Sequence, residues 1–129
     1  MSSLLKLGYF RELPHGDADG PSLREAIGTL HPDDKRRVTT YLDAGNVVAT
    51  TAGAQTFDVL DAEHRRIGRL EILTDGIWAW PRDLSYYVRN YDVVLPVAFL
   101  THAATSGWQM RTLSDAELEE LSEQNHAIL

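Results

Sequence analysis

Apolar positions follow two different periods along this chain of 129 residues. Between residues 46 and 80, short runs rich in Val, Ile, Thr and Trp alternate with turn residues, a pattern that predicts β-strands. On both sides of this region, apolar residues recur every three or four positions, as on one face of a helix. We therefore predict one α+β domain over residues 1–129, with an antiparallel β-meander of about four to five strands and helices packed on one face.

Capping residues, prolines and glycines mark the helix boundaries. Ser22 and Ser114 each precede a glutamate by three residues, which is the capping-box pattern of a helix start. Proline suits the first helical turn, where its missing N–H costs nothing, and glycine past the last turn favours a helix end. These signals predict helices over about residues 23–28, from Pro32 to a stop at Gly45, from Pro81 to about 91, from Pro96 to near Gly107, and from Ser114 to about 125.

Strands are predicted at residues 4–11, where Gly8 is unfavourable, and in two pairs around turns. Residues 46–51 and 55–60 flank Ala52-Gly53-Ala54, which suits a three-residue hairpin loop. Residues 67–74 and 77–80 flank Asp75-Gly76. This dipeptide is a strong signal for a two-residue hairpin, because both turn residues must tolerate positive φ.

The two-residue turn sets a register for the second hairpin. Thr74 then lies opposite Ile77, Leu73 opposite Trp78, Ile72 opposite Ala79, and Glu71 opposite Trp80. Side chains alternate across the pleat, so the two faces differ in composition. The face predicted to enter the core carries Leu70, Ile72, Ile77 and Ala79, and the other carries Arg69, Glu71, Leu73, Trp78 and Trp80.

This second face has two interpretations. A helix can pack over both indoles while their N–H groups find hydrogen-bond partners. Alternatively, the face is a half-open aromatic site that includes Arg69, Glu71 and the nearby Tyr86, since Trp and Arg are frequent in binding hot spots. The next predicted helix shows the same division, because Tyr87 and Tyr91 belong to its apolar stripe whereas Tyr86 points elsewhere.

Charge and composition narrow the class of partner. The chain has 12 Lys and Arg against 19 Asp and Glu, a net charge of −7, which argues against a nucleic-acid-binding surface. The same charge favours encounter with a basic protein, although it also simply keeps a small protein in solution. Because the chain has no cysteine, no N-terminal apolar segment and no apolar run of about 20 residues, we expect a cytoplasmic protein that contacts no membrane.

Catalytic, metal-binding and cofactor-binding motifs are not found in the sequence. The five histidines are scattered, and none has a metal-ligand spacing. His102 is interpreted as a helix-surface or hydrogen-bonded core residue. Neither a nucleophile elbow nor a phosphate-binding glycine loop occurs. We therefore predict no catalytic residue, no metal and no cofactor.

The last predicted helix is strongly acidic. Leu118 and Leu121 can dock it on the core, while its remaining surface is rich in carboxylates. Such a helix is commonly a solvated face, but it also suits contact with a basic protein surface. The exposed acidic residues that we expect to bind a partner are Asp115, Glu119, Glu120 and Glu123.

Residues 74–100 form a distinctive run, Thr-Asp-Gly-Ile-Trp-Ala-Trp-Pro-Arg-Asp-Leu-Ser-Tyr-Tyr-Val-Arg-Asn-Tyr-Asp-Val-Val-Leu-Pro-Val-Ala-Phe-Leu. It resembles a run in small uncharacterised actinobacterial proteins, with Thr-Asp-Gly, Trp-x-Trp-Pro, Asp-Leu-x-Tyr-Tyr-Val and Leu-Pro-x-x-Phe-Leu in order. Some of these look like immunity proteins beside polymorphic toxins. The resemblance covers about a fifth of the chain and implies an inhibitory binding role, with no catalytic residue to carry over.

Together these observations favour a non-catalytic protein-binding module, an immunity or regulatory protein that binds and inhibits a partner and is itself a monomer or a small homo-oligomer. The alternatives are a small-molecule-binding protein or enzyme that uses the face of Trp78 and Trp80, and a purely structural or oligomerising role. The residues predicted to contact a partner are Arg69, Glu71, Trp78, Trp80, Tyr86, Asp115, Glu119, Glu120 and Glu123.

Overall fold

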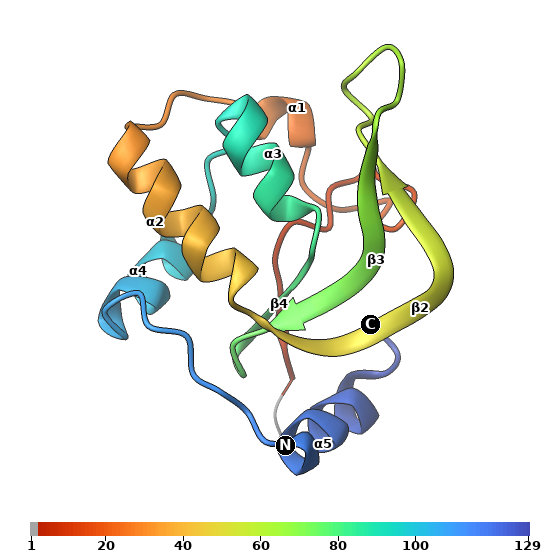
Figure 1. The fold of residues 1–129 in the computed structure, drawn as a ribbon, viewed down its shortest axis with the longest axis vertical. Coiled ribbons are helices and arrows are strands. Elements are labelled where there is room, and N and C mark those ends of the chain that lie inside the picture. The colour runs from red at the N-terminus through yellow and green to blue at the C-terminus, as the bar shows by residue number, and fades with distance from the viewer. Residues whose placement is uncertain (1–2) are drawn as a thin grey trace.

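Five helices surround a four-stranded sheet in the computed structural model, which describes residues 3–129 (Figure 1). The α+β class is confirmed. The elements in chain order are β1 (Leu5–Lys6), α1 (Leu23–Ala26), α2 (Pro32–Asp43), β2 (Asn46–Phe57), β3 (Arg66–Thr74), β4 (Trp78–Pro81), α3 (Leu84–Tyr91), α4 (Val97–Thr105) and α5 (Asp115–Asn125).

The sheet is mixed, so the prediction of a purely antiparallel meander is wrong. Its strand order is β1-β4-β3-β2, and the pairs β2–β3 and β3–β4 are antiparallel as expected. The short β1 adds to the outer side of β4 in parallel, with Leu5 opposite Trp78. This pairing joins segments far apart in the chain, so no local turn signal could reveal its direction.

The expected hairpin around Ala52-Gly53-Ala54 does not form. β2 is one strand of 12 residues, and both of its halves pair with β3. Thr50 lies opposite Glu71 and Gln55 opposite Arg69, so the four residues between them bulge out, and Gly53 has a φ of +76°. The glycine therefore bends an edge strand instead of reversing the chain. The reversal comes later, over residues 58–65.

The β3–β4 hairpin forms where predicted but with a register shifted by two residues. Thr74 lies opposite Ala79 and Leu73 opposite Trp80, so four residues separate the last paired positions instead of two. The cause is the Asp75 carboxylate, whose Oδ1 accepts hydrogen bonds from the backbone N–H groups of Ile77 (3.0 Å) and Trp78 (2.8 Å). A shift of two residues preserves the side of the sheet to which each side chain points.

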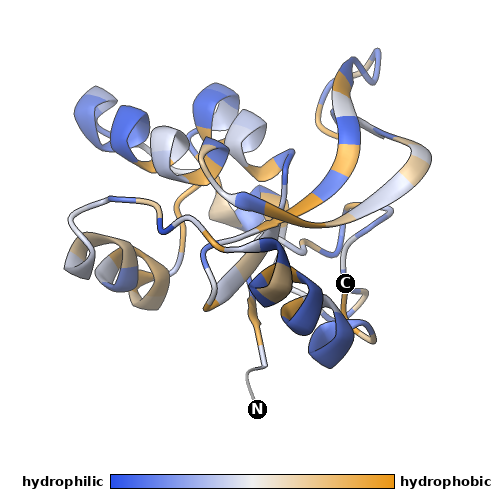
Figure 2. Ribbon diagram, turned by 60° about the horizontal axis from the view of Figure 1, so that its bottom comes forward, coloured by the Kyte–Doolittle hydropathy of each residue, from blue (hydrophilic) through white to orange (hydrophobic). Residues whose placement is uncertain are grey.

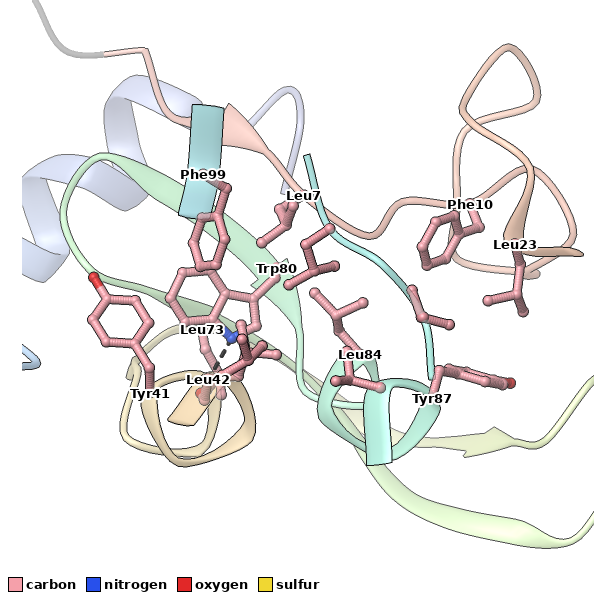
Figure 3. Close-up of a cluster of buried hydrophobic side chains, with 14 of the residues drawn as sticks. Leu7, Phe10, Leu23, Tyr41, Leu42, Leu73, Trp80, Leu84, Tyr87 and Phe99 are labelled. Atoms are coloured by element: carbon pink, nitrogen blue, oxygen red, sulfur yellow. Dashed lines mark hydrogen bonds between the residues drawn. The ribbon is translucent and has the colours of Figure 1, made fainter. Parts of the chain in front are cut away.

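Both faces of the sheet are covered, which corrects the expectation of helices on one face. Leu73 and Trp80 pack against residues of α2, α3 and α4, including Leu42, Leu84 and Phe99 (Figure 3). Ile72 and Ala79 on the opposite face pack against Leu121 of α5, together with Leu4 and Leu113. The strand pair has apolar residues on both faces next to the turn, so each face needs a cover.

Gly45 is required by packing more than by helix capping. The helix α2 ends at Asp43, with Ala44 as its C-cap, close to the predicted stop. Gly45 itself is not in a left-handed conformation. A Cβ on Gly45 would lie 2.8 Å from Cζ2 of Trp80 and 2.9 Å from Cβ of Leu73. The missing side chain lets the indole of Trp80 lie against the end of α2.

Pro81 ends β4 opposite Ile72, and α3 begins only at Leu84. The predicted helix start at Pro81 is therefore three residues too early, because Pro81 still pairs with Ile72 in the sheet. In the predicted apolar stripe of this helix, Leu84, Tyr87 and Val88 are buried, whereas Tyr91 is half-buried.

The start of α1 is held by a carboxylate from outside the predicted capping box. Ser22 Oγ accepts the N–H of Glu25 as expected (3.2 Å). Glu12 accepts hydrogen bonds from Leu23 N (2.7 Å), Arg24 N (3.0 Å) and Ser22 Oγ (2.9 Å). Burial alone would raise the pKa of Glu12, but these hydrogen bonds outweigh it and lower the pKa to about 2.

Replacing Glu12 with Gln is expected to lower the free energy of unfolding by about 1–2 kcal/mol at pH 7, because an amide N–H replaces an acceptor oxygen. The folded pKa is depressed from 4.5 to about 2, so the stabilisation is fully present above the unfolded pKa and is lost as the pH falls through the folded one. Urea unfolding at pH 7 and at about pH 2 measures the difference in the free energy of unfolding between the wild type and Glu12→Gln. Glu25→Gln, at an exposed glutamate, is the control. A Glu12→Gln deficit that stays constant down to about pH 2 would contradict this role.

Candidate functional site

Most of the net charge of the chain lies in its last segment. Residues 112–129 contain five Asp and Glu and no Lys or Arg, so they contribute −5 of the total of −7. Many other carboxylates face a cation, as in the pairs Lys6–Asp17 and Arg89–Asp43. Within residues 3–129, the contact of Arg111 with Glu117 (2.5 Å) is the only ion pair that reaches α5. The negative charge of α5 is therefore largely uncompensated.

The helix α5 is held so that its acidic residues point outward. A complete capping box starts it, since Ser114 Oγ accepts Glu117 N (3.1 Å) and Glu117 Oε1 accepts Ser114 N (3.1 Å). Leu121 is buried against the sheet, and near its end Asn125 Oδ1 accepts the N–H of Leu4 (2.9 Å). The exposed carboxylates are Asp115, Glu119, Glu120 and Glu123, as predicted for a docked helix.

A groove of about 230 Å³ separates α5 from the turn between β3 and β4. We call it the acidic groove. Leu113 and Leu121 supply its apolar surface, and Glu117 and Glu120 supply negative charge. Ile77 stands at its edge with half of its side chain exposed (50%). The groove thus combines an exposed apolar side chain with carboxylates that have no basic neighbour other than Arg111 among the residues that line it.

Ile77 is positioned by the same carboxylate that shapes the turn. Asp75 is almost fully buried, and its Oδ1 binds the backbone of Ile77 and Trp78. Its Oδ2 accepts the hydroxyl of Tyr41 in α2 (2.6 Å) and contacts Nε2 of His102 in α4 (2.9 Å). Burial, followed by the bond to Asp75, raises the pKa of the Tyr41 hydroxyl, which therefore stays protonated as a donor.

Asn46 fixes the opposite wall of the acidic groove. Its Nδ2 donates to the carbonyls of Thr74 (3.1 Å) and Arg111 (2.9 Å), and its Oδ1 accepts the N–H of Leu113 (3.1 Å). One side chain at the start of β2 thereby joins the end of β3 to the segment that enters α5. The groove is held by hydrogen bonds on both sides, which makes it a preformed surface.

The predicted aromatic site is not open. Trp80 has no exposed surface, its Nε1 donates to the carbonyl of Leu42 (3.2 Å), and its ring lies 5.8 Å from that of Phe99 (Figure 3). Trp78 is half-buried, with its ring 5.5 Å from Phe99. Both indoles lie on one side of the sheet, beneath α4. The prediction that Trp80 contacts a partner is therefore wrong. The other interpretation, in which a helix packs over the indoles, applies to Trp80.

The other predicted contact residues lie outside the acidic groove, near the start of α3. Arg69 is exposed on β3, and Glu71 is paired with Arg82 (2.6 Å). Tyr86 is half-buried, and its hydroxyl donates to the buried Asp58 (2.7 Å). Of the residues predicted from the sequence, Glu120 lines the acidic groove, and Asp115, Glu119 and Glu123 are exposed on the same helix.

Sequence reasoning missed the residues that give the acidic groove its shape. Ile77 was expected in the core, because the two-residue turn would have paired it with Thr74. Asp75 was considered only as a turn residue, and Asn46 only as the start of a strand. The available signal is the Asp-Gly dipeptide itself, because an aspartate in a turn often accepts a hydrogen bond from the backbone N–H two residues on.

The chain matches no protein-family model, and no match was found among curated proteins or solved structures. Among residues 3–129, no group of three or more His, Asp or Glu side chains is arranged to hold a metal ion. In the same part of the chain, each helix is too short or too polar to cross a bilayer. The assignment of a function therefore depends on the geometry described above.

Asp75→Ala is expected to reduce the free energy of unfolding by about 3 kcal/mol or more, since it leaves two backbone N–H groups and the Tyr41 hydroxyl without their acceptor. Denaturant unfolding followed by tryptophan fluorescence measures this loss. The exposed acid Asp19, changed to Ala in parallel, should alter stability by less than about 0.5 kcal/mol. Equal stability of the two variants would show that the Asp75 network is not needed for the turn.

Proposed function

We propose that this chain is a non-catalytic binding protein that uses α5 and the acidic groove to bind a basic protein. The observation that carries the proposal is the concentration of −5 of the net charge in residues 112–129, on a docked helix with a single ion pair among the described residues. Such a surface attracts positive charge over about 8 Å at physiological salt. It would orient the chain as a basic partner approaches.

The acidic groove can supply the short-range affinity that exposed charges alone do not provide. Exposed acidic side chains accelerate encounter, but they contribute little affinity because water and salt screen them. An apolar side chain of the partner that enters beside Ile77 and Leu113 would lose water, and its contact would slow dissociation. The exposed carboxylate of Glu120 at the same groove suits a lysine or arginine that flanks this side chain.

We further propose that binding inhibits the partner, as for an immunity or regulatory protein. The run of residues 74–100 supports this, because similar runs occur in proteins that resemble immunity proteins beside toxins. That run contains Asp75 and Ile77, which shape the acidic groove. A small-molecule site at Trp78 and Trp80 is not proposed, since Trp80 has no exposed surface. The partner to test first is a basic protein encoded next to this chain.

A matched pair of triple variants tests the charge of α5. Changing Glu119, Glu120 and Glu123 to Gln is expected to slow association with the partner by about tenfold at low salt and to weaken its salt dependence. The control changes Asp19 to Asn and both Glu25 and Glu63 to Gln, which are exposed acids elsewhere. It alters the net charge equally. Stopped-flow association rates compare them, and equal slowing by both variants would show that only net charge matters.

The acidic groove is tested separately through Ile77. Ile77→Ala should raise the dissociation rate by about tenfold while leaving the association rate nearly unchanged, because it removes a short-range contact and no charge. Phe57→Ala is the control, since Phe57 is exposed to a similar extent (47% against 50%) and lies at the end of β2 away from the turn. Surface plasmon resonance separates the two rates. An unchanged dissociation rate for Ile77→Ala would remove the acidic groove from the interface.

A further inference from the structure

The guanidinium of Arg111 lies across the acidic groove. Its Nη2 donates to Oε2 of Glu117 on α5 (2.5 Å). Its Nη1 lies over the turn between β3 and β4, 3.5 Å from the point that a Cβ on Gly76 would occupy. One side chain thus reaches both walls, and Arg111 is the only Lys or Arg among the described residues that line the groove. In the free chain the acidic groove therefore already holds one positive charge.

The backbone of Arg111 is fixed, whereas its side chain is held only weakly. The carbonyl of Arg111 accepts a hydrogen bond from Nδ2 of Asn46 (2.9 Å), which places the residue at the entrance to α5. The side chain itself is 65% exposed, and Glu117 is its only ion-pair partner within residues 3–129. An exposed ion pair adds little to stability, because water solvates both groups and the long side chain loses freedom. The guanidinium can therefore leave the acidic groove without disturbing the fold.

Glu117 keeps its orientation when Arg111 leaves. Its Oε1 accepts the N–H of Ser114 (3.1 Å), and Ser114 Oγ accepts the N–H of Glu117 (3.1 Å). The capping box thus uses one carboxylate oxygen, and the other oxygen faces Arg111. The hydrogen bond from Ser114, with the charge of Arg111, lowers the pKa of Glu117 against the effect of desolvation. Oε2 is therefore a charged, preformed acceptor for a cationic group.

The acidic groove suits the carbon stem of a basic side chain as well as its charge. The methyl carbons of Leu113 lie 3.7 and 3.9 Å from the same point above Gly76, and Leu121 adds apolar surface. Glu120 supplies a second carboxylate. Figure 2 shows this combination on α5, which has both hydrophobic and hydrophilic bands. Long basic side chains lie with their stems on apolar surface and their charged ends at polar groups.

We propose that Arg111 is a strap that closes the acidic groove in the free chain and that a basic side chain of the partner displaces it. The inference rests on the proposed function and adds the regulation of that site. Arg111 offers Glu117 the same charge as the partner would, so the two compete for one carboxylate. The strap lowers the affinity for every partner, and it does so least for a surface with several clustered lysines or arginines. It thereby raises specificity for such a surface.

NMR titration with a short basic peptide tests the strap without the natural partner. The probe is the tripeptide Arg-Leu-Arg, acetylated at its N-terminus and amidated at its C-terminus, and backbone amide shifts of residues 111–124 report its binding. Arg111→Gln should bind the peptide about fivefold more tightly than the wild type, because Glu117 is then free to pair with it. Arg24→Gln, at an exposed arginine of α1, removes the same charge and should change the dissociation constant by less than about twofold.

A double-mutant cycle separates the strap from a change in net charge. Glu117→Gln keeps an oxygen for the Ser114 N–H, so α5 should still form, and the amide spectrum checks this. In that background Arg111 has lost its ion pair, so the gain from Arg111→Gln should fall to that from Arg24→Gln. Peptide binding by Arg111→Gln that is absent, or no tighter than by Arg24→Gln, would overturn the strap.

The peptide and the partner protein separate this inference from the proposed function. Peptide binding in the expected order, with no basic protein bound by the chain, would support the strap and contradict the proposed function. Binding of a basic protein at α5 that Arg111→Gln tightens no more than Arg24→Gln does would support the proposed function and contradict the strap.

Discussion

The buried carboxylate of Asp75 joins the turn between β3 and β4 to two helices. It accepts the N–H groups of Ile77 and Trp78, receives the hydroxyl of Tyr41 from α2, and contacts the ring of His102 from α4. A buried carboxylate is tolerated only when its oxygens are satisfied, and here each oxygen has two partners. The same group sets the strand register and fixes Ile77 at the acidic groove. It also ties α4 to the sheet through His102.

The register that Asp75 imposes explains why the tryptophans belong to the core. A shift of two residues places Trp80 opposite Leu73, and both remain on the side of the sheet that α2 and α4 cover. The missing side chain of Gly45 leaves room for the indole. With α5 on the opposite face, the sheet has no open side near the turn. Binding surfaces must then come from the outer sides of the covering helices.

Local signals in the sequence predicted the helices better than the sheet. Prolines and caps placed α2 and α5 within a few residues of their observed bounds, because those signals act within one helical turn. Non-local pairing was not accessible in the same way: β1 joins β4 in parallel, and Glu12 caps α1 from a preceding loop. The acids of α5 could be predicted as exposed from helical periodicity. The position of Ile77 could not be predicted, because it depends on which backbone N–H groups the Asp75 carboxylate accepts.

The last third of the chain separates uncharged positions from acidic ones. Sequence positions 95–110 lack Asp, Glu, Lys and Arg altogether, whereas positions 112–129 carry five acids and no Lys or Arg. Asn46 binds the carbonyl of Arg111 and the N–H of Leu113 at the junction of these two segments, which directs α5 to the face of the sheet opposite α4. The acidic helix therefore faces away from the uncharged helix, and a basic partner attracted to α5 would approach the side of the molecule that α5 covers.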